Sequence, residues 1–232
     1  MLPRQNPDRN DLGEDVTDRV PAPSAAIGVH ELRPLDERIW VLAAPALKVR
    51  DNDVHSLYAY GIASALLDVL PDADPDIVLP AVLLHDIGWS TVPLPEIMQA
   101  LRPGARSSEA SLAVVRRHEV EGARLATEIL EALDVPATSV ATIARMIDGH
   151  DTRLEALSLD DAILKDADKV WRVTPAGIEV VMDWFGLTRE ESHRLNAHRT
   201  HDHLFTDAAR SMARVLSAVA WVDCSPQRAA LG

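Results

Sequence analysis

The feature that most constrains the fold is an almost wholly apolar segment, DIVLPAVLLHDIG (76–88), which contains a His-Asp doublet near its end. Asp76 is a plausible N-cap and Gly88 a natural stop, so the segment predicts a helix. A helix that is apolar on all sides is buried in a core. His85 and Asp86 are therefore expected to be buried, which is costly unless polar side chains are paired or bind something.

Most of the remaining chain has helical rather than alternating apolar periodicity. Residues 32–47 predict a first helix interrupted near Pro45, or a short strand, and residues 55–70 predict a core helix that PDADP stops. The stretch 90–113, rich in Pro, Ser and Gly, predicts an irregular loop that lines or covers a site. Further helices are expected at 116–133, 137–146, 158–173 (with a capping box formed by Ser158 and Asp161) and 189–222. These patterns predict an all-α fold.

Length and composition predict one globular domain with a tail at each end. The chain has 232 residues, of which 47% are hydrophobic and 25% charged. Residues 1–31, rich in Pro, Asp and Asn, predict a flexible leader. The domain is expected to span 32–222, with a motif core at 50–185 and a C-terminal helical extension at 187–222, followed by a tail at 223–232.

Charge and cysteine content exclude several classes of function. The formal net charge of −13 repels a phosphate backbone, so nucleic-acid binding is not expected. A small phosphorylated substrate remains compatible, because a bound metal and a few local cations reverse the field inside a pocket. Cys224 is the only cysteine, which excludes an internal disulfide and a thiolate cluster. No export signal is visible and no apolar run approaches the ~20 residues that span a bilayer, so we expect a cytoplasmic protein without a membrane partner.

Potential metal ligands recur in each successive predicted helix. Besides the doublet, His55 opens one helix, His118 opens another, His150 ends a third and Asp168 lies within a fourth. Imidazole and carboxylate together suit Fe, Mn, Zn, Co or Ni, and a set without Cys argues against a closed structural zinc site. The pattern predicts a divalent transition-metal site with open coordination positions, as catalysis requires.

Five ordered segments, VHSLYAYGIA, AVLLHDIGW, RHEVEGARLATEIL, IDGHD and ILKDADKVWR, resemble the motifs of the HD superfamily of metal-dependent phosphohydrolases. The resemblance implies an HD-domain helical bundle with the metal site between core helices. It also implies that one or two ions are bound by His55, His85, Asp86, His118, His150 and Asp168. Asp86 would bridge the two ions, and His118 and His150 would serve only the second. In KDADK the family pattern selects Asp168, which leaves Asp166 as a capping or supporting residue.

The resemblance further implies that a metal-activated water cleaves a nucleotide or another small phosphoester, with Asp86 at the centre of catalysis. Cations beside ligand positions are candidates for binding the phosphate, with solvated surface charge as the alternative for each. They are Arg117, Arg153, Arg172 and Lys169, of which Lys169 is also a candidate catalytic residue. Asp151, beside His150, is expected either to orient a ligand or to act as a general base.

Trp89 is a departure from the family pattern, because many hydrolytic members have Lys at this position. The tryptophan is expected to stack on a substrate nucleobase or to pack in the core. The GYP signature of cyclic-dinucleotide phosphodiesterases is also absent, since DGHDTRLEALSL includes and follows His150, and that activity is disfavoured.

Two other functions fit the same ligand set. One is a di-iron oxygenase on the HD scaffold, and the other is a regulatory module that binds metal or ligand without turnover.

Two features of the C-terminal region allow more than one interpretation. The histidines of ESHRLNAHRTHDHLF (His193, His198, His201 and His203) are expected at the surface, with metal binding or insertion into a partner subunit as the alternative. An apolar stripe suggests a homo-oligomer; its members are Leu204, Met212, Val215, Leu216 and Val219.

Overall fold

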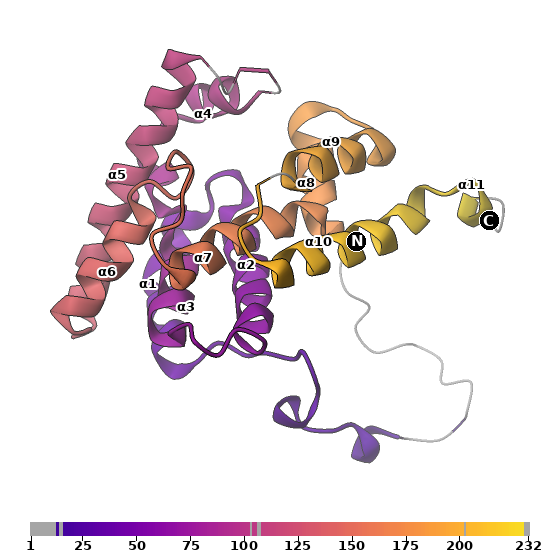
Figure 1. Cartoon of the computed structure of the whole chain (residues 1–232), viewed down its shortest axis with the longest axis horizontal. Helices are drawn as coiled ribbons and strands as arrows, with labels where there is room; N and C mark the ends of the chain where they lie inside the picture. The colour runs from indigo at the N-terminus through magenta and orange to yellow at the C-terminus, as the bar shows by residue number, and fades with distance from the viewer. Residues whose placement is uncertain (1–12, 14–15, 103, 106–107, 202, 230–232) are drawn as a thin grey trace. The chain divides into compact units, whose positions relative to one another are not determined.

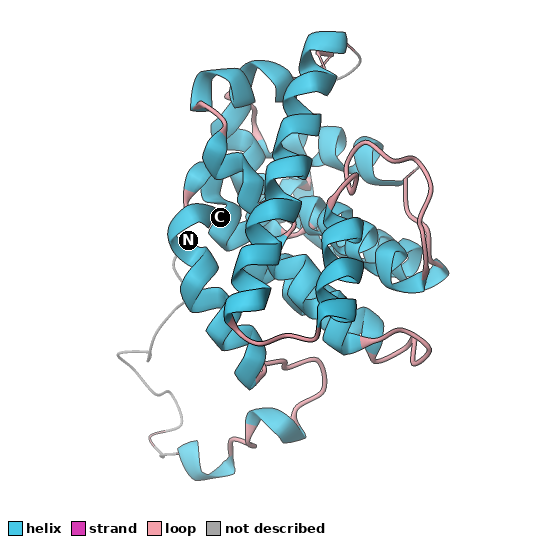
Figure 2. Cartoon of the chain, turned by 90° about the vertical axis from the view of Figure 1, so that its left-hand side faces the viewer, coloured by secondary structure: helices cyan, strands magenta, loops and turns pink. Residues whose placement is uncertain are grey.

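The computed structural model describes residues 13, 16–102, 104–105, 108–201 and 203–229. This described part contains helices and loops and no strand, which confirms the predicted all-α class (Figure 2). The chain forms two compact units, residues 1–31 and 32–232. The first unit holds two short 3-10 helices, Thr17–Arg19 (η1) and Pro23–Ala25 (η2). Residues 1–12 and 14–15 of the expected flexible leader lie outside the described residues.

The second unit carries all the α-helices that the structure describes (Figure 1). In chain order the elements are α1 (Pro34–Leu47), η3 (Val49–Asp51), α2 (Asn52–Leu67), α3 (Pro75–Leu84), η4 (Ile87–Thr91), α4 (Leu94–Leu101), α5 (Glu109–Ala132), α6 (Ala137–Ile147), α7 (Leu159–Val170), η5 (Trp171–Val173), α8 (Pro175–Phe185), α9 (Arg189–His201), α10 (Asp207–Trp221), η6 (Val222–Cys224) and α11 (Pro226–Ala229).

Helix α3 is the centre of the bundle. Every residue from Ile77 to Leu84 is buried, and the helix contacts α1, α2, α6 and α7. Its N-cap is Asp74, whose side chain accepts a hydrogen bond from the backbone N–H of Asp76. The predicted cap, Asp76, was therefore wrong by two residues, because Pro75 occupies the first helical position, where its missing N–H costs nothing.

The predicted irregular loop at 90–113 was wrong. Most of it is helical: η4 ends at Thr91, α4 spans Leu94–Leu101 and α5 begins at Glu109. Pro93 and Pro95 misled the prediction, because proline favours helix starts as well as loops and here stands at the N-cap and second position of α4. Ser108 caps α5 by accepting from the N–H of Ser111, so α5 begins seven residues before the predicted start at 116.

Other predicted helices hold with shifted bounds. The 32–47 segment is one helix, α1, which continues through Pro45, so neither an interruption nor a strand is present there. Helix α2 covers 52–67 rather than 55–70, and Leu57 on it is exposed. Helix α6 begins at the predicted residue, directly after Pro136, and ends one residue later than predicted, at Ile147.

Helix α7 begins at Ser158, whose hydroxyl accepts from the N–H of Asp161 as predicted. The carboxylate of Asp161 does not complete the capping box; it accepts from Arg153 and from the N–H of Leu157. Asp166, in the second half of α7, accepts from the N–H groups of Phe205 and Thr206. It thus supports the turn before α10, whose N-cap is Thr206, and of its two predicted roles the structure shows the supporting one.

The predicted helical tail at 189–222 is two helices, α9 and α10, and its apolar stripe is divided. Leu204 is buried and Met212 and Leu216 pack on the core, whereas Val215 and Val219 are exposed. Small residues, Ala209, Ala213 and Ala220, form the buried face of α10 instead.

No single described helix is both long and apolar enough to cross a membrane. One helix pair, Pro75–Thr91 with Leu94–Leu101, passes the test of length and composition together but is bent by 115°.

Candidate metal centre

The six predicted ligand residues come from five different parts of the bundle. His55 lies in the first turn of α2, His85 and Asp86 follow the last residue of α3, and Asp168 lies in α7. His118 lies in the middle of α5, and His150 lies in the turn after α6. All six side chains are buried. Buried polar groups on five elements of one core require a common partner.

The first group of ligand atoms lies between α2, α3 and α7. Asp86 Oδ2 lies 3.5 Å from His55 Nε2 and 3.7 Å from His85 Nε2. Asp168 Oδ1 lies 3.5 Å and 3.8 Å from the same two nitrogens. The two Nε2 atoms are 2.9 Å apart. Two imidazoles and two carboxylates thus converge on one point.

The second group lies between α3, α5 and the turn after α6. The other carboxylate oxygen, Asp86 Oδ1, lies 3.5 Å from His150 Nε2 and 3.6 Å from His118 Nε2. The two imidazole nitrogens are 3.4 Å apart. Asp86 therefore belongs to both groups and offers one oxygen to each.

These distances suit ligands that share cations. Most of them exceed ordinary N–H···O hydrogen-bond lengths of about 2.7–3.2 Å. Two ligands that each lie about 2.1 Å from one tetrahedral ion are about 3.4 Å apart. His85 Nδ1 lies 2.7 Å from the carbonyl of Val82, and His150 Nδ1 lies 2.9 Å from the carbonyl of Ile147. Donation to these carbonyls leaves each Nε2 lone pair facing the centre, as in known metal sites.

The ligand side chains differ in how readily they accept a cation, because burial and neighbouring charges shift their pKa values in opposite directions. Burial lowers the pKa of His55 to about 3 and that of His118 to about 4, so both imidazoles are neutral at pH 7. Burial raises the pKa of Asp86, but His85 and the other imidazoles outweigh burial and hold it well below the ordinary value. For His150, burial lowers the pKa, but the bond to Asp86 and nearby carboxylates raise it to about 9. That imidazole must release a proton when it binds a cation.

Two glycines allow α3, η4 and α5 to approach closely enough for the second group. A Cβ on Gly88 would lie 1.9 Å from the carbonyl oxygen of His118 and 2.5 Å from the backbone N of Gly122. A Cβ on Gly122 would lie 3.2 Å from the carbonyl oxygen of His85. The Gly88–Gly122 crossing thus brings Asp86 to His118.

Trp89 packs beside the two groups of ligands. Its indole Nε1–H donates to Asp86 Oδ1 at 3.0 Å, and its ring stacks on His118 at 3.8 Å with an interplanar angle of 10°. The guanidinium of Arg50 lies 5.2 Å from the ring centroid, and the Trp89 side chain is 2% exposed. The structure thus shows the predicted core packing, with an added hydrogen bond to the shared carboxylate. Trp89 is also among the residues that line the smaller of the two cavities described below, so stacking on a substrate base stays a prediction.

Sequence reasoning missed Glu119, which fixes the His150 turn. Its fully buried carboxylate accepts from the N–H groups of Asp151 and Thr152 at 2.8 and 2.7 Å. It also accepts from the Thr152 hydroxyl at 2.7 Å and from Arg116 at 2.9 Å. The signal was present in the RHE segment, where a Glu directly follows a ligand His, but its partners in the His150 turn, Asp151 and Thr152, lie more than 30 residues away.

The predicted phosphate-binding cations differ in position. Arg172 lies 3.5 Å from Asp168 Oδ2, and Lys169 Nζ donates to the carbonyl of Lys165 at 3.1 Å. Arg153 is held by Asp161 and by the carbonyl of Asp148. Arg117 pairs with Glu96 on α4 at 2.5 Å and lines neither of the cavities described below, so its surface alternative is the one found.

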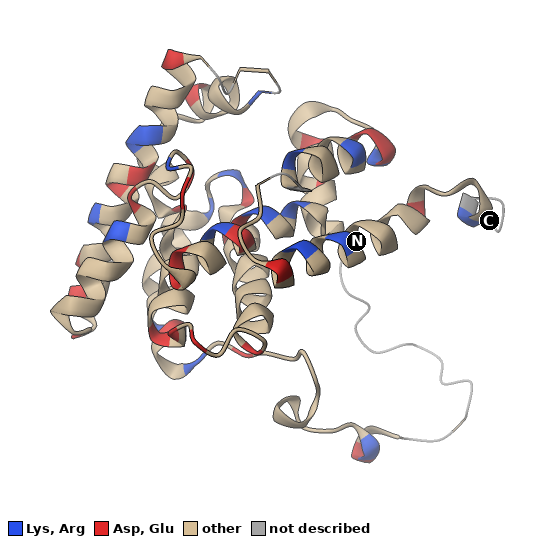
Figure 3. Cartoon of the chain, viewed as in Figure 1, with Lys and Arg blue, Asp and Glu red and all other residues tan. Residues whose placement is uncertain are grey.

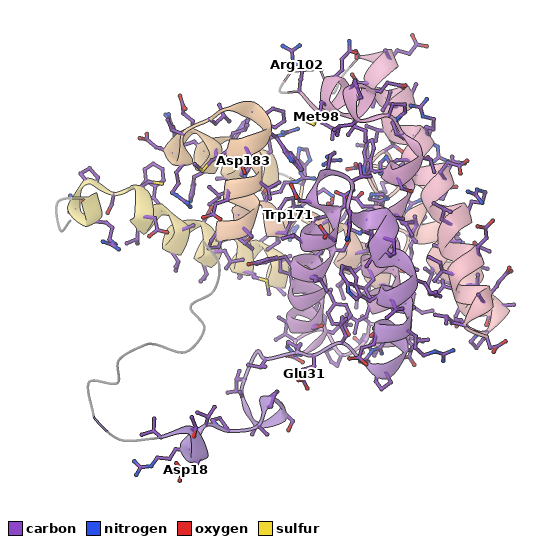
Figure 4. The ribbon with its side chains drawn as sticks, turned by 180° about the vertical axis from the view of Figure 1, so that it is seen from behind. Asp18, Glu31, Met98, Arg102, Trp171 and Asp183 are labelled. Atoms are coloured by element: carbon purple, nitrogen blue, oxygen red, sulfur yellow. The ribbon has the colours of Figure 1, made fainter. Side chains whose placement is uncertain are left out.

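Two cavities adjoin the ligand groups. The smaller, of about 60 Å³, is lined by His55, Asp86 and Asp168, and Trp171 forms part of its wall. Trp171, labelled in Figure 4, lies with its ring centroid 4.5 Å from that of His55. The larger, of about 560 Å³, is lined by His150 and, among others, Lys169 and Arg153. Asp151, Arg172 and Arg199 line both cavities.

The C-terminal histidines do not form one surface cluster. His193 is buried, and its Nε2 lies 2.8 Å from the carbonyl oxygen of Ser217, so the predicted surface position was wrong for this residue. His198 and His203 are exposed and line the larger cavity. The side chain of His201 lies outside the described residues.

Comparison with known proteins identifies the family. The family model of the HD domain matches residues 52–172, more than half of the chain and the segment that carries all six ligand residues. The chain belongs to the HD domain family. This confirms the predicted family, and the helical bundle is the one expected for it.

A solved structure shares the HD-domain fold. It is a predicted HD superfamily hydrolase from an uncultured Thermotogales bacterium, with a TM-score of 0.56 and 21% identity over 84% of this chain and 92% of that one. A search of curated proteins gives no match.

Proposed function

We propose that this HD-domain protein is a metal-dependent phosphohydrolase that releases phosphate from a small phosphoester. The observation that carries the proposal is the shared carboxylate of Asp86, whose two oxygens face two separate histidine pairs. Such an arrangement suits two divalent transition ions, drawn from Fe, Mn, Zn, Co and Ni. His55, His85, Asp86 and Asp168 would hold one ion, and Asp86, His118 and His150 the other.

Bound ions would supply a water of lowered pKa and charge to stabilise the phosphoryl oxygens. Among the described residues, the second group provides three protein ligands, which would leave coordination positions open for water and substrate. Walls of Trp171, Trp184 and Phe185 around the smaller cavity limit access of bulk water.

The chain's own charged groups favour a phosphoester over a neutral substrate. Arg172 and Arg199 line both cavities beside the ligands, and Lys169 lines the larger one. Guanidinium groups bind phosphate oxygens with paired hydrogen bonds, so these side chains would orient the ester against the metal groups. Asp151 also lines both cavities and is placed to accept a proton from an attacking water or to hold that water in position.

The proposal is tested by phosphate release from a panel of nucleotides and simple phosphoesters with added Mn²⁺. We expect release by the unmodified protein and none above background by Asp86→Ala, with metal content reduced in that variant. Asp72→Ala, which removes an exposed carboxylate between α2 and α3, is the matched control and should retain both. Absence of phosphate release from every compound, together with oxygen consumption by a form that contains two irons, would instead establish the oxygenase alternative.

A further inference from the structure

We propose that the larger cavity binds a second anionic group of the substrate, so that the substrate is a small molecule with two anionic groups. One is the phosphoester at the metal ligands, and the other is a phosphate or carboxylate in the larger cavity. This inference rests on the proposed hydrolase function and names the class of substrate for the same site.

The volumes of the two cavities limit where a substrate can lie. The smaller cavity, at about 60 Å³, has room for roughly four water molecules, which is about the size of a phosphoryl group. The remainder of a substrate must lie elsewhere. The larger cavity, at about 560 Å³, shares Asp151, Arg172 and Arg199 with the smaller one and is also lined by the ligand His150. It is therefore the adjoining space.

The charged side chains that line the larger cavity are mainly cations. Four cationic side chains line the larger cavity, whereas Asp151 is the one carboxylate among the described residues that line it. The chain as a whole has a formal net charge of −13, so this excess of positive charge runs against its general character. Figure 3 shows basic residues on both α7 and α9, the helices that supply Lys169 and Arg199. A cavity of one sign concentrates ligands of the opposite sign.

The cationic side chains of the larger cavity differ in their contacts and in their place in the chain. Arg153 is engaged by Asp161 and backbone carbonyls, and Arg172 lies beside the predicted ligand Asp168. Arg199 comes from α9, outside the residues matched by the HD family model, as do the exposed imidazoles of His198 and His203. By their place in the cavity wall, these three side chains of the C-terminal extension would contact the second anion together with Lys169.

Helix α9 is anchored to the metal-bearing segment in a way that fixes Arg199. The buried side chain of Asn196 donates to the carbonyl of Arg172 at 2.8 Å, and the buried hydroxyl of Thr200 donates to the carbonyl of Lys169 at 3.3 Å. These two bonds flank Arg199 in sequence and join α9 to the end of α7. In contrast, Arg194 on the same helix is largely exposed and lies 3.6 Å from Glu190, an ordinary surface pair.

Part of the cavity wall is apolar. Leu154, Leu195, Leu204 and Phe205 also line the cavity, so a short carbon skeleton between the two anionic groups of the substrate would contact them.

The test compares substrates in matched pairs: a hexose monophosphate with its bisphosphate, and phenyl phosphate with carboxyphenyl phosphate. We expect the doubly anionic member of at least one pair to have the lower KM. The pair that shows the difference tells whether the second group is a phosphate or a carboxylate.

The variant Arg199→Met keeps an unbranched side chain and removes its charge. It should raise the KM of the preferred double anion by about tenfold or more beyond any rise for the singly anionic partner, with kcat little changed. Arg194→Met is the matched control and should leave both unchanged.

The two proposals fail differently. If the singly and doubly anionic members are cleaved equally well and Arg199→Met has no selective effect, the second subsite is wrong while the hydrolase stands. If no compound releases phosphate, the hydrolase proposal fails and the subsite fails with it.

Discussion

The Trp89 side chain restrains the orientation of the neighbouring Asp86 carboxylate. The carboxylate of Asp86 faces four imidazole nitrogens at 3.5–3.7 Å, and its direction decides whether two groups or one can form. Trp89 restrains that direction with a 3.0 Å hydrogen bond to Oδ1 while its ring covers His118. Both contacts concern the second group, so Trp89 would be a positioning residue for the second ion of the proposed centre.

Replacing Trp89 with Phe keeps an aromatic ring on His118 and removes the hydrogen bond to Asp86. We expect the affinity of the weaker metal site to fall by about tenfold to a hundredfold, as for other residues that orient ligands. The first site should change little, because the indole donates to the Asp86 oxygen that faces the second group and its ring stacks on His118 of that group. Metal titration followed by elemental analysis measures both sites. Trp221→Phe, on α10, is the control, and equal metal affinities in all three proteins would refute the role.

At this scale the sequence predicted the ligand set but not its supports. All six predicted ligands converge in the structure. They could be predicted because His and Asp on otherwise apolar segments are conspicuous in a sequence. Glu119 and Asn196 escaped prediction, since their partners are backbone groups distant in the chain. For Arg117 and Trp89 the sequence left two roles open, because adjacency to a ligand in sequence does not tell which way a side chain points.

Among the contacts between elements, the contact of η4 with α5 is the most sensitive to an added side chain. Gly88 meets the backbone of His118 and Gly122 so closely that any Cβ must displace one element. Because Asp86 lies two residues before Gly88, a displacement separates its Oδ1 from His118 and His150. The second group of ligands is then the first to be lost.

Gly88→Ala should therefore cost about 1–3 kcal/mol of stability or more, and it should lower the bound metal toward one ion per chain. Gly61→Ala is a matched control on α2, where a Cβ meets nothing within 4 Å. The control should stabilise the helix by about 0.5–1 kcal/mol, because alanine loses less conformational freedom than glycine. Urea unfolding and metal analysis of both variants measure these effects. Equal stability and equal metal content would show that the crossing is not required.

Helices were predicted correctly where an apolar pattern extended over many residues. They were missed where the prediction depended on the meaning of a proline. Helices α3 and α5 were expected from their patterns, although α5 begins earlier than predicted. Helix α4 was missed because Pro93 and Pro95 are equally compatible with a loop and a helix start. The break between α9 and α10 was also missed, since Asp166 fixes the 205–206 turn from a distance of about 40 residues in sequence.

At the scale of the whole molecule, the ligand cluster links folding to metal and to pH. In the metal-free protein, burial lowers the pKa of His150, but the bond to Asp86 and the carboxylates of Asp151 and Glu119 outweigh it and raise the value to about 9. The raised pKa contributes stability that is fully present below about 6.5 and is lost as pH rises through about 9. A cation that binds His150 must displace this proton, so metal binding strengthens over the same interval.

The stability gained from metal should accordingly grow with pH. Each pH unit below 9 weakens metal binding by about tenfold through this proton, or about 1.4 kcal/mol of stabilisation at a fixed excess of metal. For a domain of this size, the difference in Tm between Mn²⁺-loaded and chelator-treated protein should widen by roughly 3–5 °C per unit between pH 6.5 and 8.5. Thermal unfolding at three pH values measures it, with Asp86→Ala expected to show little difference at any of them. A gap that narrowed as pH rose would mean that His150 does not release a proton to the metal, and its place among the ligands would then be wrong.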